Sequence, residues 1–148
     1  MKKLLIILST LLLLIGCNSS DSNEIIKTSF NELNSQEKQL LQELDSNKSF
    51  YLYKGDNKYL NLKFNICESS SCKNFNLLIG NKNLNFGINS SNLYIFYPDD
   101  TRKFVVTKVD ENSFILTNLK QQCQNAIAVN KEDALNLSNG DLPLCTNW

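Results

Sequence analysis

Cysteine is the residue type in this chain that could support the widest range of chemistry. Cys17 follows an apolar run, whereas Cys67, Cys72, Cys123 and Cys145 lie in the rest of the chain. Four thiols allow two disulfides with three possible pairings, and an even number favours disulfides in an exported domain. Because both partners are close in sequence, we favour the pairs Cys67–Cys72 and Cys123–Cys145.

Zinc binding and thiol redox chemistry are the alternatives for these cysteines. Zinc sites usually carry ligand pairs separated by two to four residues, and only Cys67 and Cys72 meet that spacing. Thiol redox motifs usually have two intervening residues, whereas this pair has four. We therefore expect structural disulfides and no metal site.

The chain contains no histidine, and its single methionine is Met1. This composition excludes Ser-His-Asp and Cys-His catalysis, histidine-ligated zinc and thioether copper sites. A Ser-x-x-Lys spacing occurs at residues 70–73, but its companion motifs are missing. The carboxylate pairs at 99–100 and 110–111 lie where we expect hairpin turns. We therefore expect no catalytic residue and no cofactor, that is, a protein that is not an enzyme.

The first sixteen residues have the layout of a secretory signal. A positive head at Met1–Lys3 precedes an apolar run over Leu4–Ile15, which is too short to cross a membrane. The stretch Leu14-Ile15-Gly16-Cys17 resembles the lipobox of bacterial lipoproteins. This resemblance implies cleavage before Cys17, whose sulfur carries a diacylglycerol and whose amine usually carries a further acyl chain such as palmitate.

The same resemblance implies a location and a division of the chain. Asn18 follows the lipidated cysteine in place of the aspartate that resembles an inner-membrane retention signal. We therefore expect a lipid anchor in the cell outer membrane, with the domain facing the periplasm. The expected parts are a signal peptide (1–16), a lipidated cysteine and tether (17–23) and a single globular domain (24–148).

Charge argues against a nucleic-acid partner. Removal of Lys2 and Lys3 with the signal leaves 13 basic residues against 15 acidic ones. Nucleic-acid binding needs a basic patch, which this balance does not favour.

Apolar periodicity predicts helices at both ends of the domain. Residues 24–45 have apolar positions at helical spacing, with Asn34 and Glu37 placed as a capping box. We expect one interrupted helix or two short ones there. A short helix is expected over 131–137, capped by Asn130, within a disulfide-tied tail over 131–148. Trp148 is expected either to pack on the core or to sit at the lipid interface.

Short runs of β-branched and aromatic residues between turn signals predict an antiparallel meander over 49–130. The expected strands are residues 49–54, 58–66, 74–79, 83–88, 92–97, 103–109 and 113–118, with a weaker eighth at 126–130. The fold class is therefore mainly β (α+β), with an N-terminal amphipathic helix packed on a small sheet, sandwich or barrel of seven to eight strands. Residues 93–97 are apolar on both faces, so we expect the helix to cover one of them; the alternative is a ligand cavity or an exposed partner patch.

The stretch 93–119, with KFVVTKVDENSFILTNL at its centre, looks like the late strands of lipocalin-like domains. The Gly-x-Trp of typical lipocalins is absent, since Trp148 is the only tryptophan. The resemblance implies a cavity for an apolar ligand.

Two functions compete. The first is a non-enzymatic envelope lipoprotein that binds a protein partner as an accessory module. The second is a lipocalin-like carrier of a lipid or small apolar ligand. Strand aromatics provide the candidate binding surface for either function: Tyr51, Tyr53, Tyr94 and Phe96.

Overall fold

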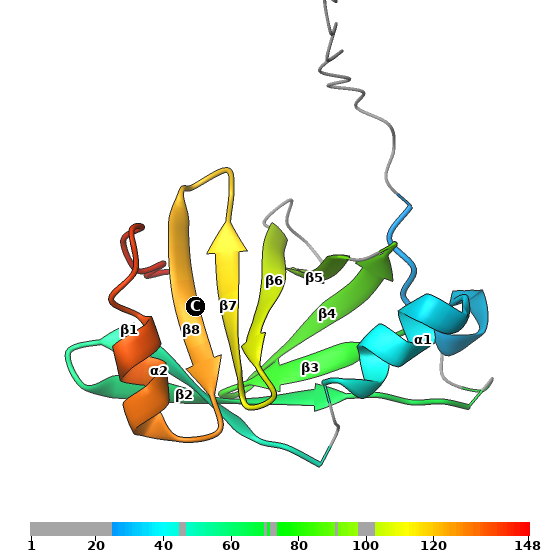
Figure 1. The fold of residues 1–148 in the computed structure, drawn as a ribbon, viewed down its shortest axis with the longest axis horizontal. Coiled ribbons are helices and arrows are strands. Elements are labelled where there is room, and N and C mark those ends of the chain that lie inside the picture. Colours follow the sequence, from blue (N-terminus) through cyan, green and yellow to red (C-terminus); the bar gives the residue numbers. More distant parts are fainter. Residues whose placement is uncertain (1–24, 45–46, 70, 72–73, 91, 98–102) are drawn as a thin grey trace, which may run out of the picture.

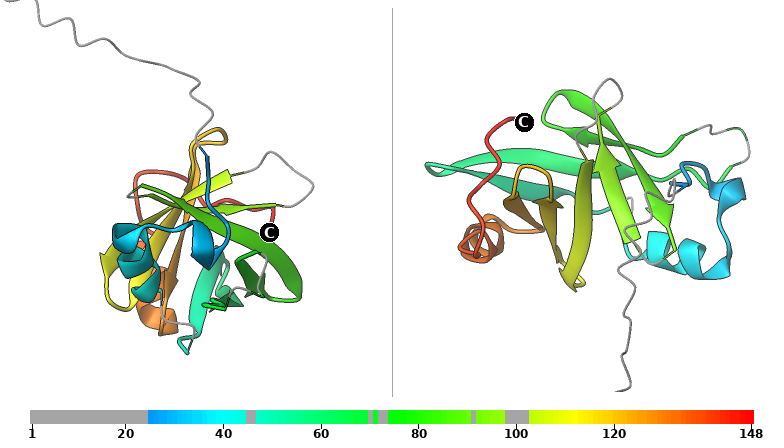
Figure 2. Two further views of the ribbon diagram at one scale, coloured as in Figure 1. Left: turned by 90° about the vertical axis from the view of Figure 1, so that its right-hand side faces the viewer. Right: turned by 90° about the horizontal axis from the view of Figure 1, so that it is seen from above.

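The chain folds into a closed barrel of eight antiparallel strands that follow one another in chain order (Figures 1 and 2). The computed structural model describes residues 25–44, 47–69, 71, 74–90, 92–97 and 103–148. The strands are β1 (Phe50–Gly55), β2 (Lys58–Asn65), β3 (Asn76–Ile79), β4 (Lys82–Asn89), β5 (Asn92–Phe96), β6 (Lys103–Asp110), β7 (Ser113–Asn118) and β8 (Cys123–Ala128). The expected mainly-β antiparallel meander is confirmed, and it closes as a barrel and not as a sandwich.

Local sequence explains most strand boundaries, but the eighth strand was misplaced. The β1–β2 hairpin turns at Asp56 and Asn57, whose φ values of 52° and 57° suit residues that tolerate the left-handed region. β8 was expected at 126–130, yet it begins at Cys123 because Cys123 pairs with Asn118 and extends the β7–β8 hairpin. The start of β8 was not predicted because Gln124 and Asn125 are polar residues that are untypical of a buried strand.

Side chains fill the described interior of the barrel. Alternate residues are buried along much of β2, β4 and β7, so one face of the sheet points inward. The ring of Phe50 contacts Phe64 and Phe114 edge to face, with centroids 6.0 and 5.7 Å apart. Phe86 continues this group at 5.3 Å from Phe64. Aromatic rings from β1, β2, β4 and β7 therefore occupy the centre of the barrel.

The N-terminal region is helical over only part of the expected range 24–45. It contains a 3₁₀ turn at Phe30–Glu32 and the helix α1 over Ser35–Gln42. The predicted capping box is confirmed, because Asn34 and Glu37 exchange two hydrogen bonds of 2.9 Å. Leu41 belongs to the same buried cluster as the barrel interior. How the helix as a whole packs on the sheet stays a prediction.

Residues before the 3₁₀ turn are extended, which corrects the helical expectation. Lys27 and Ile88 form an antiparallel bridge with hydrogen bonds of 2.8 and 2.9 Å. β3 pairs with β4 only as far as Asn85, so the edge of β4 beyond that point is open to another partner. Backbone hydrogen bonding to this edge outweighs the helical periodicity of the segment.

Gly87 lets this segment approach β4 closely. A Cβ at position 87 would collide with Ile26 and would lie 2.7 Å from the backbone oxygen of Lys27. We expect Gly87→Ala to destabilise the domain by about 1–3 kcal/mol and to speed hydrogen exchange of the Lys27 and Ile88 amides. At the control position, Gly140→Ala would meet only the flexible side chain of Gln124. Unchanged exchange at Lys27 in the Gly87 variant would contradict this packing.

A partly buried ion pair ties the same segment to α1. The Lys27 ammonium lies 3.0 and 2.9 Å from the two carboxylate oxygens of Glu37, whose side chain is buried. Burial raises the pKa of the Glu37 carboxyl, but the Asn34 N–H, the Lys27 ammonium and the Ser90 N–H together hold that pKa below its usual 4.5. The pair therefore stabilises the fold while Glu37 is ionised.

The lowered pKa of Glu37 predicts acid sensitivity. A folded-state pKa below that of the unfolded chain gives stability that is present above the unfolded pKa and is lost as pH falls through the folded pKa. We expect the free energy of unfolding to fall between about pH 5 and pH 3, and Glu37→Gln to reduce that fall. Urea unfolding across this range measures it, with the exposed Glu43→Gln as the control. An identical pH profile for the two variants would refute the assignment.

The segment after β8 closes one side of the barrel. The helix α2 (Lys131–Leu137), capped by Asn130 as expected, lies against β1 and β8. β1 and β8 pair only at Tyr51–Ala128 and Leu52–Ile127. Beyond that short pairing, the backbone N–H of Gln124 in β8 bonds to the carbonyl of Pro143 at 2.9 Å. The tail therefore takes up hydrogen bonding that β1 does not provide to β8.

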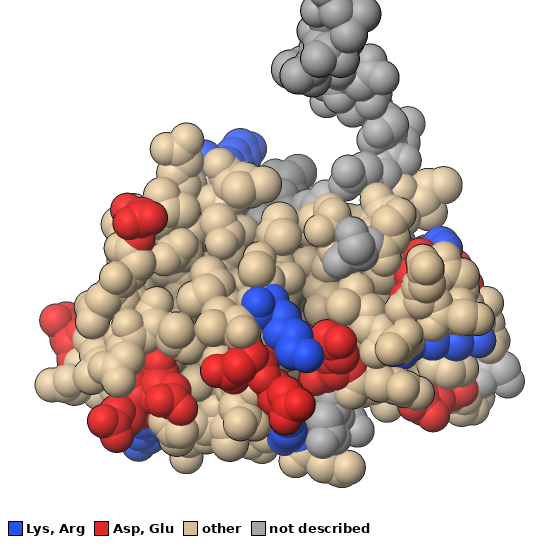
Figure 3. All heavy atoms as spheres, viewed as in Figure 1, with Lys and Arg blue, Asp and Glu red and all other residues tan. Residues whose placement is uncertain are grey.

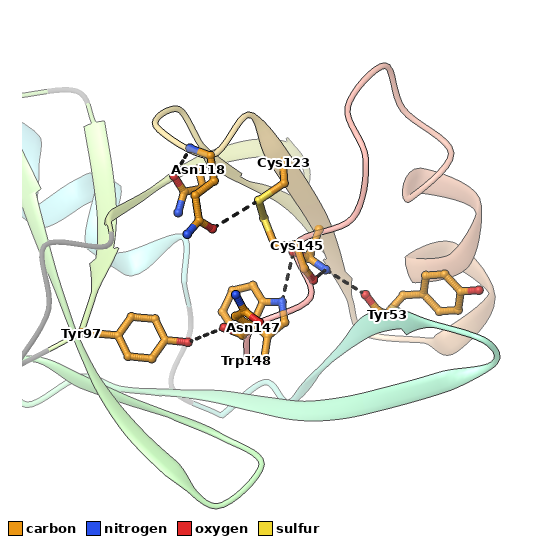
Figure 4. The surroundings of a disulfide bond; sticks show 9 residues. Tyr53, Tyr97, Asn118, Cys123, Cys145, Asn147 and Trp148 are labelled. Atoms are coloured by element: carbon orange, nitrogen blue, oxygen red, sulfur yellow. Dashed lines mark hydrogen bonds between the residues drawn. A yellow bond between two sulfur atoms is a disulfide. The ribbon is translucent and has the colours of Figure 1, made fainter.

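A disulfide and a buried amide hold this tail (Figure 4). Cys123 and Cys145 form the expected disulfide. The buried Asn125 amide donates to the carbonyls of Tyr53 and Cys145 at 3.2 and 3.3 Å, and it accepts from the Trp148 indole N–H at 3.1 Å. The indole stacks on Phe104 with ring centroids 4.7 Å apart. Trp148 therefore packs on the core, the first of the two expected placements.

The second expected disulfide is not shown. Cys67 is itself disulfide-bonded, but its expected partner Cys72 lies outside the described residues. The Cys67–Cys72 pairing stays a prediction.

Candidate functional site

The four aromatic residues expected to form a binding surface lie on two different strands. Tyr51 and Tyr53 are on β1, and Tyr94 and Phe96 are on β5. In both strands the alternate residues are buried in the core, so these four side chains point out of the barrel and do not line its interior. Since β2, β3 and β4 separate β1 from β5, the structure does not bring the two pairs together.

The tyrosines of β1 form a cluster with Tyr59 of β2. The ring centroid of Tyr59 lies 5.3 Å from Tyr53 and 6.4 Å from Tyr51. The Lys131 ammonium lies over the rings of Tyr51 and Tyr59, at 5.3 and 5.4 Å from their centroids. All three rings are half-buried, so each keeps an accessible part. Tyr59 and Lys131 were not predicted from the sequence, although the two-residue hairpin at 56–57 places Tyr59 opposite Tyr53.

The two β5 aromatics differ in access. Tyr94 is only 5% exposed and pairs with Gly87, over which the N-terminal segment passes. Phe96 is half-buried and pairs with Asn85 of β4. Only Phe96 therefore contributes to an accessible surface.

Between the β1 tyrosines and Phe96 lies a surface dominated by asparagine. We call it the outer amide face; it comprises the outward residues Asn61, Asn65, Asn76, Leu78, Asn83 and Asn85 of β2, β3 and β4. Asparagine is depleted in strands because its side chain competes for backbone hydrogen bonds and packs poorly on a pleated surface. Since asparagine is abundant throughout this chain, these positions are distinguished by their alignment across the strands.

The amides of this face form an ordered row across the strands. Asn65, Asn76 and Asn85 pair in register on β2, β3 and β4, and Phe96 continues the row on β5. The Asn65 amide donates to the Asn76 carbonyl oxygen at 2.9 Å. The sequence feature that could have indicated this row is the alternation of asparagine with apolar residues at 83–86. That alternation is also typical of an ordinary amphipathic strand.

A hollow of about 200 Å³ lies at the β1 end of the outer amide face. Its lining includes the outward side chains of Tyr51, Asn61, Lys63 and Leu78. The Leu78 side chain is 39% exposed, so it is accessible from the hollow. The hollow therefore combines a ring, an amide, an ammonium group and an apolar side chain.

The other candidate chemistry has a structural explanation or lies outside the described residues. The Asp110 carboxylate accepts a 2.8 Å hydrogen bond from the Asn112 N–H, which holds the pKa of Asp110 below its usual value and closes the β6–β7 turn. The Ser-x-x-Lys at 70–73 and the carboxylates at 99–100 involve residues outside the described part. Within the described ranges, no cluster of three or more cysteine or acidic residues could hold a metal ion.

Charge does not gather on the visible surface. On the face drawn in Figure 3, acidic and basic side chains are interspersed and most of the surface carries neither. Of the helices that the structure describes, none is long and apolar enough to span a membrane. Cys17, the expected lipidation site, lies outside the described residues.

Comparison with models of protein families, with curated proteins and with solved structures found no match for this chain.

Proposed function

We propose that this chain is a lipid-anchored, non-enzymatic binding and accessory module of the bacterial envelope. It holds its partner on the outside of the barrel, across the surface that runs from the β1 tyrosines over the outer amide face to Phe96. The observation that carries this proposal is the cross-strand row of asparagines that ends in an aromatic ring. Such an ordered array of donors and acceptors on strands suits recognition.

The carrier function has less support from the geometry. An eight-stranded barrel is the architecture of lipocalins, and its interior can hold a small ligand. Here, however, the described inward positions are filled by buried rings such as Phe50, Phe64 and Phe86. The expected cavity residues Tyr51, Tyr53, Tyr94 and Phe96 all point outward. A ligand inside the barrel would have to displace the core.

The anchor proposal rests on the signal layout and Cys17. Two or three acyl chains on one cysteine would hold the domain stably on a membrane, since one chain holds only marginally. The residue after Cys17 favours the outer membrane, and the disulfide fits the oxidising periplasm. The tether of residues 18–23 would keep the domain close to the membrane surface.

The test is purification of the tagged full chain from its own membranes in mild detergent. Mass spectrometry should find Cys17 at the N-terminus with its lipid, together with a bound companion. Leu78→Asp should remove the companion, whereas Thr107→Asp should retain it, because exposed Thr107 lies on β6, opposite β2 in the barrel. An unmodified N-terminus would refute the anchor. An apolar small molecule retained by both variants would establish the carrier function instead.

A further inference from the structure

We infer that the outer amide face binds an uncharged glycan, laid across the strands from the β1 tyrosines toward Phe96. This inference rests on the proposed function, because it names the partner class of the same surface. The face offers hydrogen-bonding groups and flat apolar patches, which a neutral sugar chain also carries. Its charged groups are the Lys63 ammonium on β2 and the Lys131 ammonium over the tyrosine rings.

The amides supply the hydrogen bonds. Each asparagine side chain carries two N–H donors and a carbonyl acceptor, so it can serve a hydroxyl or an acetamido group in either role. The bond between Asn65 and Asn76 uses one donor and one acceptor and orients both groups along the row. Within the described part of the chain, the Asn83 and Asn85 side chains form no hydrogen bond to the protein. These two amides can therefore pair with a ligand without breaking a protein contact.

Aromatic rings lie at both ends of the amide face. Tyr59 and Tyr51 stand at the β2 and β1 end, and Phe96 ends the row on β5. The C–H faces of a pyranose ring pack on aromatic faces through dispersion and weak C–H contacts. With strands about 4.8 Å apart, the row from Asn65 to Phe96 spans roughly 14 Å. That length fits an oligosaccharide and exceeds a single sugar ring.

Charge and polarity favour a neutral partner over a polyanion or a protein. Lys63 is the one charged side chain among the outward residues of β2 and β3 between Tyr59 and Leu78, too little for a polyanion. The centre of a protein–protein interface is mostly apolar and enriched in aromatic residues and arginine. The outer amide face offers Leu78 as its only large apolar side chain. A neutral polar chain therefore fits this surface better than a protein does.

The test uses the full chain in detergent micelles and three defined probes: N-acetylchitotetraose, cellotetraose and the polyanion polygalacturonate. Titration is followed by calorimetry and by the side-chain NH₂ signals of asparagine in nitrogen–proton correlation spectra. We expect one or both neutral tetramers to shift the Asn76, Asn83 and Asn85 signals and not the signal of exposed Asn139. Asn83→Ala/Asn85→Ala should weaken binding at least about ten-fold, whereas Asn139→Ala should leave it unchanged.

Three results would overturn the inference. The first is the absence of any shift with both neutral tetramers at millimolar concentration. The second is binding of polygalacturonate alone, which would assign the face to an anionic ligand. The third is a protein companion that is lost in the Asn83→Ala/Asn85→Ala variant while neither tetramer binds. In that third case the glycan inference falls, but the proposed binding module stands.

Discussion

Replacing Phe86 with alanine should destabilise the folded domain by about 3–5 kcal/mol, as expected for a fully buried phenylalanine. Phe86 is 1% exposed, stacks on Phe75 at 5.2 Å and meets Phe64 edge to face. Its removal would leave a cavity at the centre of the barrel, where rigid neighbours cannot collapse into the space. Urea unfolding followed by circular dichroism measures the change.

Phe96→Ala is the matched control for Phe86→Ala. Phe96 is the same residue type on the neighbouring strand, but it points outward and is half-buried. We expect its removal to cost less than about 1.5 kcal/mol. Equal losses for the two variants would show that side chains do not fill the barrel interior. An apolar dye that binds the native protein as tightly as it binds the Phe86 variant would lead to the same conclusion.

The paired change Cys123→Ser/Cys145→Ser should lower the free energy of unfolding by about 3 kcal/mol. The disulfide joins residues 22 apart in sequence, and opening it restores the conformational freedom of that loop in the unfolded chain. The change should also loosen the tail, because Trp148 depends on Cys145 for its position near Asn125. Tryptophan fluorescence should therefore shift toward the red in the folded variant.

Serine replacement is preferable to a reducing agent here, since Cys67 is also disulfide-bonded. Cys67→Ser/Cys72→Ser provides the comparison, and Trp148 fluorescence should stay unchanged in that protein. Native fluorescence and stability after the loss of Cys123 and Cys145 would contradict a tail held by this disulfide.

Strand periodicity and turn residues were sufficient to predict the meander, because several strands alternate buried and more exposed residues between turn-forming residues. The capping box at Asn34 and the helix after Asn130 were predictable for the same reason: each depends on neighbours in sequence. The conformation of Lys27 was not, because it depends on β3 beginning only at Asn76, opposite Asn85, which leaves the edge of β4 beyond that point open. No local pattern carries that information.

The binding surface was predicted only in part. Aromatic residues are easily recognised in a sequence, so Tyr51 and Phe96 were identified as candidate binding residues. Their positions in the sequence do not give the arrangement in space of the strands between them. Register across three strands aligns Asn65, Asn76 and Asn85, and that alignment depends on both intervening turns. Tyr94 was misjudged as a surface residue because its cover comes from a distant segment.

Photo-crosslinking in living cells tests most directly whether the domain binds its partner on the outside of the barrel between β1 and β5. Benzoylphenylalanine would replace Leu78 on the outer amide face in one variant and Thr107 on β6 in the other. We predict a discrete cross-linked product from position 78 and none from position 107. Equal products from both positions, or a product from position 107 alone, would contradict binding on this face.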